Sequence, residues 1–169
     1  MLDYLNQPFI AIHNLNRFGK SGRCDGVTEL QVGSYVFMDV GYMGIGSKSG
    51  SELYNDFRPS LTVLTTVVSA THQDLVTVDA GAKSMAASPT PIVKGFAGFK
   101  YRRFGDEFGA ITSTAGEPLP RLGDRLEMIV PHCDPTVNLY GHICVIRGDK
   151  VEALWEITAR RKLIRPAQT

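Results

Sequence analysis

Hydrophobic residues along the chain form short runs of about five to ten positions, separated by Gly, Pro, Asn or Asp. In the clearest run, residues 61–69, Leu61 and Val63 alternate with Thr62 and Leu64. Alternation with a period of two places the two sets on opposite faces of a strand. The pattern predicts strands over residues 33–39, 61–69, 75–78, 95–101, 110–114, 125–131, 139–146 and 151–158.

Turn and helix signals complete the prediction of the fold class. The last two predicted strands are joined by residues 147–150, whose Gly148-Asp149 centre suits a tight hairpin turn. Only residues 48–55 and 80–87 could form a helical turn or two, and neither has a sustained apolar stripe. We therefore predict an all-β chain, a mainly antiparallel β domain with few short helical turns.

Composition and charge exclude several classes of function. The 169 residues suffice for one compact domain, and 18 Lys and Arg against 17 Asp and Glu give a net charge of +1. Without a broad basic surface, neither a nucleic acid nor an anionic membrane is expected as partner. The longest apolar stretch, residues 61–70, is far shorter than the roughly 20 residues that span a bilayer, and no secretory signal opens the chain. A cytoplasmic protein with reduced cysteines is expected, since the three cysteines form no paired motif.

The segment Val-Pro-His-Cys-Asp-Pro at residues 130–135 is the best candidate for chemistry. Pro131 and Pro135 stiffen the chain on either side of His132 and Asp134. In an extended backbone these two side chains point to the same side, so an imidazole nitrogen and a carboxylate oxygen can approach one divalent ion, such as Zn or Mn. Two protein ligands leave coordination positions open for water or substrate, as a Lewis-acid site requires.

The residues alone leave other interpretations of this segment open. His132 can be a hydrogen-bonded turn residue, with Asp134 capping Thr136 or Val137 in an Asx turn. A cupin-like site would need a second histidine and a nearby glutamate, but the next glutamate is Glu152. A structural zinc site, in which adjacent residues would have to converge, could use His132, Cys133, His142 and Cys144.

A second polar segment, Asp79-Ala-Gly81-Ala-Lys83, follows a predicted strand. We interpret it as structural: Asp79 and Gly81 shape the turn, and Lys83 forms an ion pair at the surface or at an interface. Tyr35, Tyr42 and Tyr140 could line a pocket, but tyrosines on strands mostly pack, so no tyrosine is assigned a catalytic role.

Three segments together resemble a known family: residues 27–39 (VTELQVGSYVFMD), 78–83 (VDAGAK) and 131–140 (PHCDPTVNLY). They resemble the C-terminal domain of the D-threonine aldolase and D-serine dehydratase family, over roughly residues 26–160. In that family, a pyridoxal-phosphate fold type III group, an N-terminal α/β barrel holds the cofactor and a C-terminal β domain adds a divalent metal. The resemblance implies that this chain is the C-terminal β domain, with the barrel domain absent.

The resemblance also implies roles for His132 and Asp134. The aldolase branch has a His-x-Asp pattern with a cysteine between the two, whereas the dehydratase branch has His-x-Cys, so both residues are expected to bind the metal, Mn or Zn. The implied function is that of a metal- and pyridoxal-phosphate-dependent lyase of the D-threonine aldolase type, cleaving D-threonine to glycine and acetaldehyde. A D-serine dehydratase-type lyase and a catalytically inert truncated β module are the alternatives.

Departures from the family pattern limit what the chain is expected to do alone. No lysine lies in a motif matching the family's Schiff-base lysine, which belongs to the barrel, so no catalytic residue is assigned and pyridoxal phosphate is expected only in a full-length enzyme. Residues 16–25 replace the family's Gly/Ser/Thr-rich phosphate-binding run, and Phe108 stands where a histidine is expected. We therefore divide the chain into a divergent, poorly packed segment, residues 1–25, and the β domain, residues 26–169. A small-molecule D-amino acid is the expected substrate, and the exposed former barrel interface would favour a homodimer or self-association.

Overall fold

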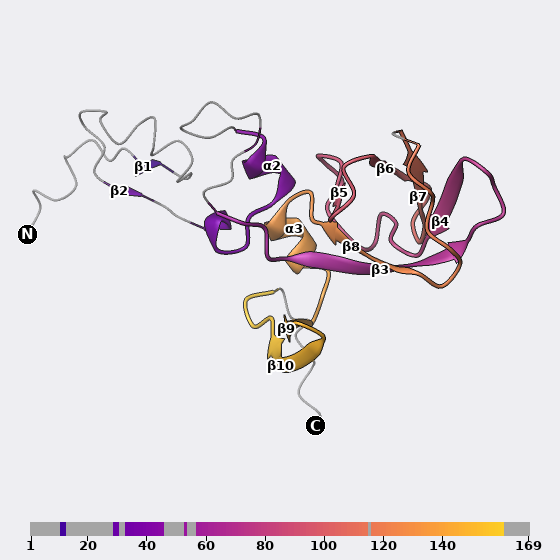
Figure 1. Cartoon of the computed structure of the whole chain (residues 1–169). Coiled ribbons are helices and arrows are strands. Elements are labelled where there is room, and N and C mark those ends of the chain that lie inside the picture. The colour runs from indigo at the N-terminus through magenta and orange to yellow at the C-terminus, as the bar shows by residue number, and fades with distance from the viewer. Residues whose placement is uncertain are drawn as a thin grey trace, which may run out of the picture.

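The computed structural model describes residues 11–12, 29–30, 33–45, 53, 57–114 and 116–160. Most of its elements are strands, and its helices are short (Figure 1). Within the described residues, no helix has the length and apolarity needed to cross a membrane. The elements in chain order are β1 (Ala11–Ile12), β2 (Glu29–Leu30), η2 (Ser34–Val36), α2 (Val40–Met43), β3 (Thr62–Ser69), β4 (Leu75–Val78), β5 (Ile92–Val93), β6 (Phe99–Arg103), β7 (Gly109–Ser113), β8 (Arg125–Ile129), α3 (Cys133–Val137), β9 (His142–Arg147) and β10 (Lys150–Glu156).

The centre of the fold is a six-stranded antiparallel sheet in the order β5-β8-β3-β4-β7-β6. The two outermost strands, β5 and β6, lie close to each other, so the sheet curls toward closure. Strands β9 and β10 form a separate antiparallel hairpin beside it, and β1 pairs with β2 in parallel (Figure 1). This architecture confirms the predicted antiparallel β class with few short helices.

The alternating pattern of the strands builds the core on the inner face of the curled sheet. In β3, Val63 and Val67 are buried, whereas Leu64 points outward and is 60% exposed. Met128 on β8 and Ile111 on β7 are fully buried and join the same cluster. Each such side chain contributes about 1.5–3 kcal/mol of burial free energy, so the core fixes the register of the strands that lead to the candidate site.

The predicted strand over residues 33–39 is wrong. Its β-branched and aromatic residues favour a strand, yet the chain forms the helical turn η2 and then α2. Met38 adopts a positive φ of 52°, which interrupts any extended run, and Asp39 caps α2 by accepting a hydrogen bond from the Tyr42 backbone N–H at 2.9 Å. A local capping interaction therefore overrides the strand preference of the sequence.

Other boundaries differ in smaller ways. The predicted strand 95–101 begins later, because Gly95 with φ 85° forms a turn before β6. Residues 80–87 form turns and not a helix, and of the predicted helical turn 48–55 all but Leu53 lies outside the described residues. The hairpin turn at Gly148-Asp149 is confirmed, with Gly148 at φ 58°. Most of the segment predicted to be divergent, residues 1–25, also lies outside the described residues.

An ion pair at the edge of the sheet gives a pH-dependent contribution to stability. Glu127 on β8 accepts hydrogen bonds from the Lys94 ammonium at 2.7 Å and from the Thr62 hydroxyl at 3.1 Å. The Lys94 contact holds the pKa of the Glu127 carboxyl below its usual range. A depressed folded-state pKa contributes stability above the unfolded-state pKa and loses it as the pH falls through the folded-state value.

We expect Glu127→Gln to lower the free energy of unfolding by less than about 1 kcal/mol at neutral pH, because the pair is partly exposed. The difference in stability from the unaltered chain should vanish in acid, where the Glu127 carboxyl is protonated and is as uncharged as the glutamine of the variant. Urea unfolding of both proteins at neutral pH and at roughly pH 3 measures this. A difference that persisted in acid would show that the lost interaction is not the ion pair.

Candidate metal site

The segment after β8 turns directly into a short helix. His132 has an extended backbone (φ −149°, ψ 132°) and is the N-cap residue of α3. Pro135 lies in the first turn of α3, where a backbone N–H would have no helical partner, so proline is tolerated there. The prediction of a wholly extended segment is therefore wrong at Asp134, which belongs to the helix.

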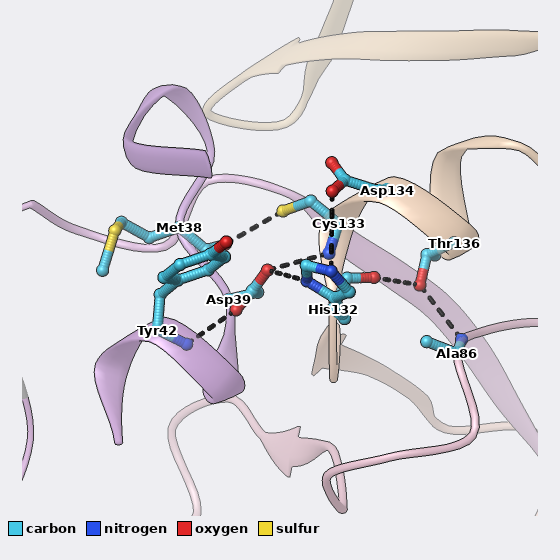
Figure 2. Close-up of polar contacts among 8 residues, drawn as sticks. All are labelled: Met38, Asp39, Tyr42, Ala86, His132, Cys133, Asp134 and Thr136. Carbon is cyan, nitrogen blue, oxygen red and sulfur yellow. Dashed lines mark hydrogen bonds and ion pairs between the residues drawn. The ribbon is translucent and has the colours of Figure 1, made fainter. Parts of the chain in front are cut away.

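Helix α2 is hydrogen-bonded to the backbone of this segment. The backbone N–H groups of Val40 and Gly41 donate to the carbonyl oxygens of Val130 and Pro131, both at 3.1 Å. These bonds satisfy donors at the start of α2 that have no partner within the helix. They bring Asp39, at the N-terminal end of α2, next to His132 (Figure 2).

The carboxylate of Asp39 is fully buried and is the centre of a hydrogen-bond network. Its Oδ1 accepts from the Tyr42 backbone N–H, and its Oδ2 contacts His132 Nδ1 at 2.9 Å and accepts from the Cys133 backbone N–H at 2.8 Å (Figure 2). A buried carboxylate is stable only when its oxygens are satisfied in this way. The network joins two segments that are 93 residues apart in the sequence.

The other nitrogen of His132 faces Asp134. The distance from His132 Nε2 to Asp134 Oδ2 is 3.5 Å, and the two side chains are 34% and 78% exposed. The structure thus brings together the two residues singled out from the sequence and leaves them open to solvent (Figure 2). Two ligands about 2.1 Å from one tetrahedral ion lie about 3.4 Å apart, so the spacing of these two atoms fits a shared divalent ion.

Thr136 fixes α3 from the opposite side. It is buried, its hydroxyl donates to the His132 carbonyl at 2.7 Å, and the same hydroxyl oxygen accepts from the Ala86 backbone N–H at 3.0 Å. The buried Thr136 hydroxyl therefore fixes the backbone of His132, while the Asp39 carboxylate fixes its imidazole ring. No Asx turn from Asp134 to Thr136 is seen in the described region.

Cys133 does not take part in the candidate site. Its side chain is buried, and Sγ lies 3.5 Å from the Met38 carbonyl oxygen, to which it donates. Burial, together with the neighbouring Asp39 charge, raises the pKa of the Cys133 thiol far above its usual range, so the thiol stays protonated. The alternative zinc site is not formed: the described part of the chain holds no cluster of three or more residues drawn from His, Cys, Asp and Glu.

The segment Asp79 to Lys83 is structural, as predicted. Asp79 Oδ1 accepts from the Thr65 hydroxyl at 2.6 Å and from the Thr66 backbone N–H at 2.8 Å. Lys83 forms an exposed ion pair with Glu107. Every one of these contacts stabilises the turn after β4 and none of them reaches His132.

Asp39 is the residue of the site that sequence reasoning missed. It was placed at the end of a predicted strand, and nothing local relates it to a histidine 93 positions later. One signal was present: an aspartate three residues before Tyr42, in a sequence that can begin a helix, is the pattern of an N-cap.

Comparison with known sequences assigns the chain to a family. The family model described as "Putative serine dehydratase domain" matches residues 60–146. The chain is 41% identical over 134 residues to D-threonine aldolase from an Arthrobacter species, which covers 79% of this chain and 34% of the relative. It is 36% identical over 136 residues to 3-hydroxy-D-aspartate aldolase from Paracoccus denitrificans, covering 79% of this chain and 35% of that protein. The chain thus spans about a third of the length of these curated relatives.

Solved structures agree with the sequence comparison. The crystal structure of D-threonine aldolase from Filomicrobium marinum matches 90% of this chain and 40% of its own, with a TM-score of 0.77 and 30% identity. D-threo-3-hydroxyaspartate dehydratase from Delftia sp. matches 88% of this chain and 44% of its own, with a TM-score of 0.68 and 23% identity, which shows a shared fold. Aldolases and dehydratases of this kind are lyases.

Proposed function

We propose that this chain is the metal-binding domain of a lyase acting on D-β-hydroxy amino acids. The premise is its family: the chain belongs to the C-terminal domain family of the D-threonine aldolases and D-serine dehydratases. The family resemblance expected from three sequence segments is thereby confirmed. The metal, the substrate and the activity of a whole enzyme are the proposed part.

The observation that carries the proposal is the pairing of His132 Nε2 with Asp134 Oδ2 at 3.5 Å. A neutral imidazole and a carboxylate are suitable ligands for Zn or Mn, and both side chains are open to solvent. Because His132 Nδ1 is engaged by Asp39, the nitrogen left for a metal is the one that faces Asp134. The buried Cys133 thiol offers no competing ligand.

Each residue of the site has a separate task in this proposal. His132 and Asp134 would hold the ion, and with only two protein ligands the ion could also bind water or substrate. When bound, a divalent ion supplies Lewis-acid chemistry, polarising an oxygen such as the β-hydroxyl of the substrate. Asp134 also adds a negative charge, which offsets part of the charge of a cation at this exposed site.

Pyridoxal phosphate is proposed for the whole enzyme, where it would serve as electron sink. We assign none of the described residues to it. Lys83 and Lys94 form exposed ion pairs with Glu107 and Glu127, and neither lies in a motif that matches the family's Schiff-base lysine. A whole enzyme would also need the barrel domain, and the part of the relatives that this chain does not cover is long enough to contain one.

The substrate we propose is D-threonine, cleaved to glycine and acetaldehyde. The relatives with the higher identities are named for D-threonine and for 3-hydroxy-D-aspartate, and both amino acids carry a hydroxyl on the β-carbon. A protein containing both the barrel and this domain should therefore release acetaldehyde from D-threonine. Release of 2-oxobutanoate in its place would assign the dehydratase reaction.

The metal site is tested by calorimetric titration of the chain with Mn or Zn salts. Because both ligands are lost, the His132→Ala/Asp134→Ala double variant should bind at least about 100-fold more weakly. The control is His142→Ala/Asp149→Ala, which removes the same residue types from exposed positions of the β9–β10 hairpin and should leave the affinity unchanged. Equal uptake by the double variant and the unaltered chain would reject the ligand assignment.

A further inference from the structure

We infer that Asp39 is a positioning residue that fixes the tautomer of His132, so that the proton is on Nδ1 and the lone pair of Nε2 faces Asp134. The consequence for metal binding rests on the function proposed above. The tautomer itself is a property of the metal-free chain and can be observed without any ion.

The hydrogen bonds around Asp39 determine the direction of the contact with His132. Each carboxylate oxygen already accepts one backbone N–H, from Tyr42 on Oδ1 and from Cys133 on Oδ2. Backbone N–H groups can only donate, so both oxygens act as acceptors. The His132 nitrogen 2.9 Å from Oδ2 must then be the donor, which places the proton on Nδ1.

A neutral imidazole has one donor nitrogen and one acceptor nitrogen. With Nδ1–H used by Asp39, Nε2 carries the lone pair, and this is the atom 3.5 Å from Asp134 Oδ2. Carboxylates that bind the second nitrogen of a histidine fix its orientation and increase its basicity toward a metal. Asp39 therefore prepares His132 as a ligand although it does not touch the ion.

The carboxylate itself has almost no freedom to move. It is fully buried at the N-terminal end of α2, and α2 is tied to the backbone on both sides of Pro131. The ring of Tyr42 lies 5.8 Å from the His132 ring, between centroids, with the two planes tilted by 50°. Such a rigid acceptor holds the imidazole in one orientation before any ligand arrives.

The test is Asp39→Asn, which keeps the shape of the side chain but turns one acceptor oxygen into an NH₂ donor. In either orientation of the amide, the NH₂ faces a backbone N–H, of Tyr42 or of Cys133, and when it occupies the Oδ2 position it also faces His132 Nδ1. The ¹⁵N chemical shifts of the His132 ring, measured without metal, should show Nδ1–H in the unaltered chain. They should move toward Nε2–H in Asp39→Asn when the NH₂ occupies the Oδ2 position, and in Asp39→Ala, which removes both acceptor oxygens. The affinity for Mn or Zn should fall about 10–100-fold.

The matched control is Asp79→Asn, because the Asp79 carboxylate, like that of Asp39, accepts hydrogen bonds from both a side chain and the backbone. It should lower stability and leave the His132 tautomer and the metal affinity unchanged. An Nε2–H tautomer in the unaltered chain would overturn the inference, and so would an unchanged tautomer in folded Asp39→Ala, which leaves no carboxylate or amide oxygen beside Nδ1. If the unaltered chain shows Nδ1–H and Asp39→Ala shifts, the inference stands even where neither protein takes up metal, a result that would instead reject the proposed metal site.

Discussion

Replacing Gly81 with alanine is expected to lower the free energy of unfolding by about 3 kcal/mol or more. A Cβ at this position would lie 2.4 Å from the Asp106 carbonyl oxygen and 2.5 Å from the Phe108 backbone nitrogen. Both contacts are with backbone, which cannot rotate away as a flexible side chain can. The loop after β4, which contains Gly81, and the loop after β6, which contains Asp106, are also joined by a hydrogen bond from the Lys83 N–H to the Asp106 carbonyl at 3.0 Å. Neither loop can therefore move away easily to make room for the added Cβ.

Urea unfolding of Gly81→Ala and of the unaltered chain measures this loss. The matched control is Gly44→Ala, because Gly44 has an ordinary helical φ of −65° and its Cβ would meet its nearest neighbours at 3.4 Å. That control should change stability by less than about 1 kcal/mol. Similar stability of the two variants would mean that the loops after β4 and β6 do not pack as closely as described.

Replacing Met128 with alanine is expected to cost about 2–5 kcal/mol, the second of the large effects. Met128 is fully buried in β8, in register with Val63 on β3 and Val93 on β5, so truncation leaves a cavity between three strands. Leu64→Ala on the outer face of β3, where the side chain is 60% exposed, is the control and should change stability by less than about 0.5 kcal/mol. Equal losses in the two variants would place the core on the wrong face of the sheet.

The sequence predicts the sheet well where side-chain burial decides the structure. Strands β3, β4, β7 and β8 follow from short runs of alternating or β-branched residues, and the Gly148-Asp149 turn follows from its composition. Prediction fails where a single local interaction outweighs the pattern. The run 33–39 has strand-forming residues, but the positive φ of Met38 and the capping by Asp39 redirect the chain into α2.

The candidate site shows the same limit. His132 and Asp134 were identified from an extended geometry, and their side chains do meet, although Asp134 lies in the first turn of α3. Pro135, read as a residue that keeps the chain extended, is accommodated inside that first turn. Asp39 could not be connected to His132 from the sequence, because the contact arises only when α2 packs beside the end of β8.

The position of Asp39 has a practical consequence for how the domain is delimited. The match to the family model begins at residue 60, and a protein trimmed to that boundary would keep His132 and Asp134 but lose the carboxylate that holds the imidazole. The backbone carbonyls of Val130 and Pro131 would lose their N–H partners from Val40 and Gly41 as well. The smallest piece that retains the whole arrangement must therefore start ahead of Asp39.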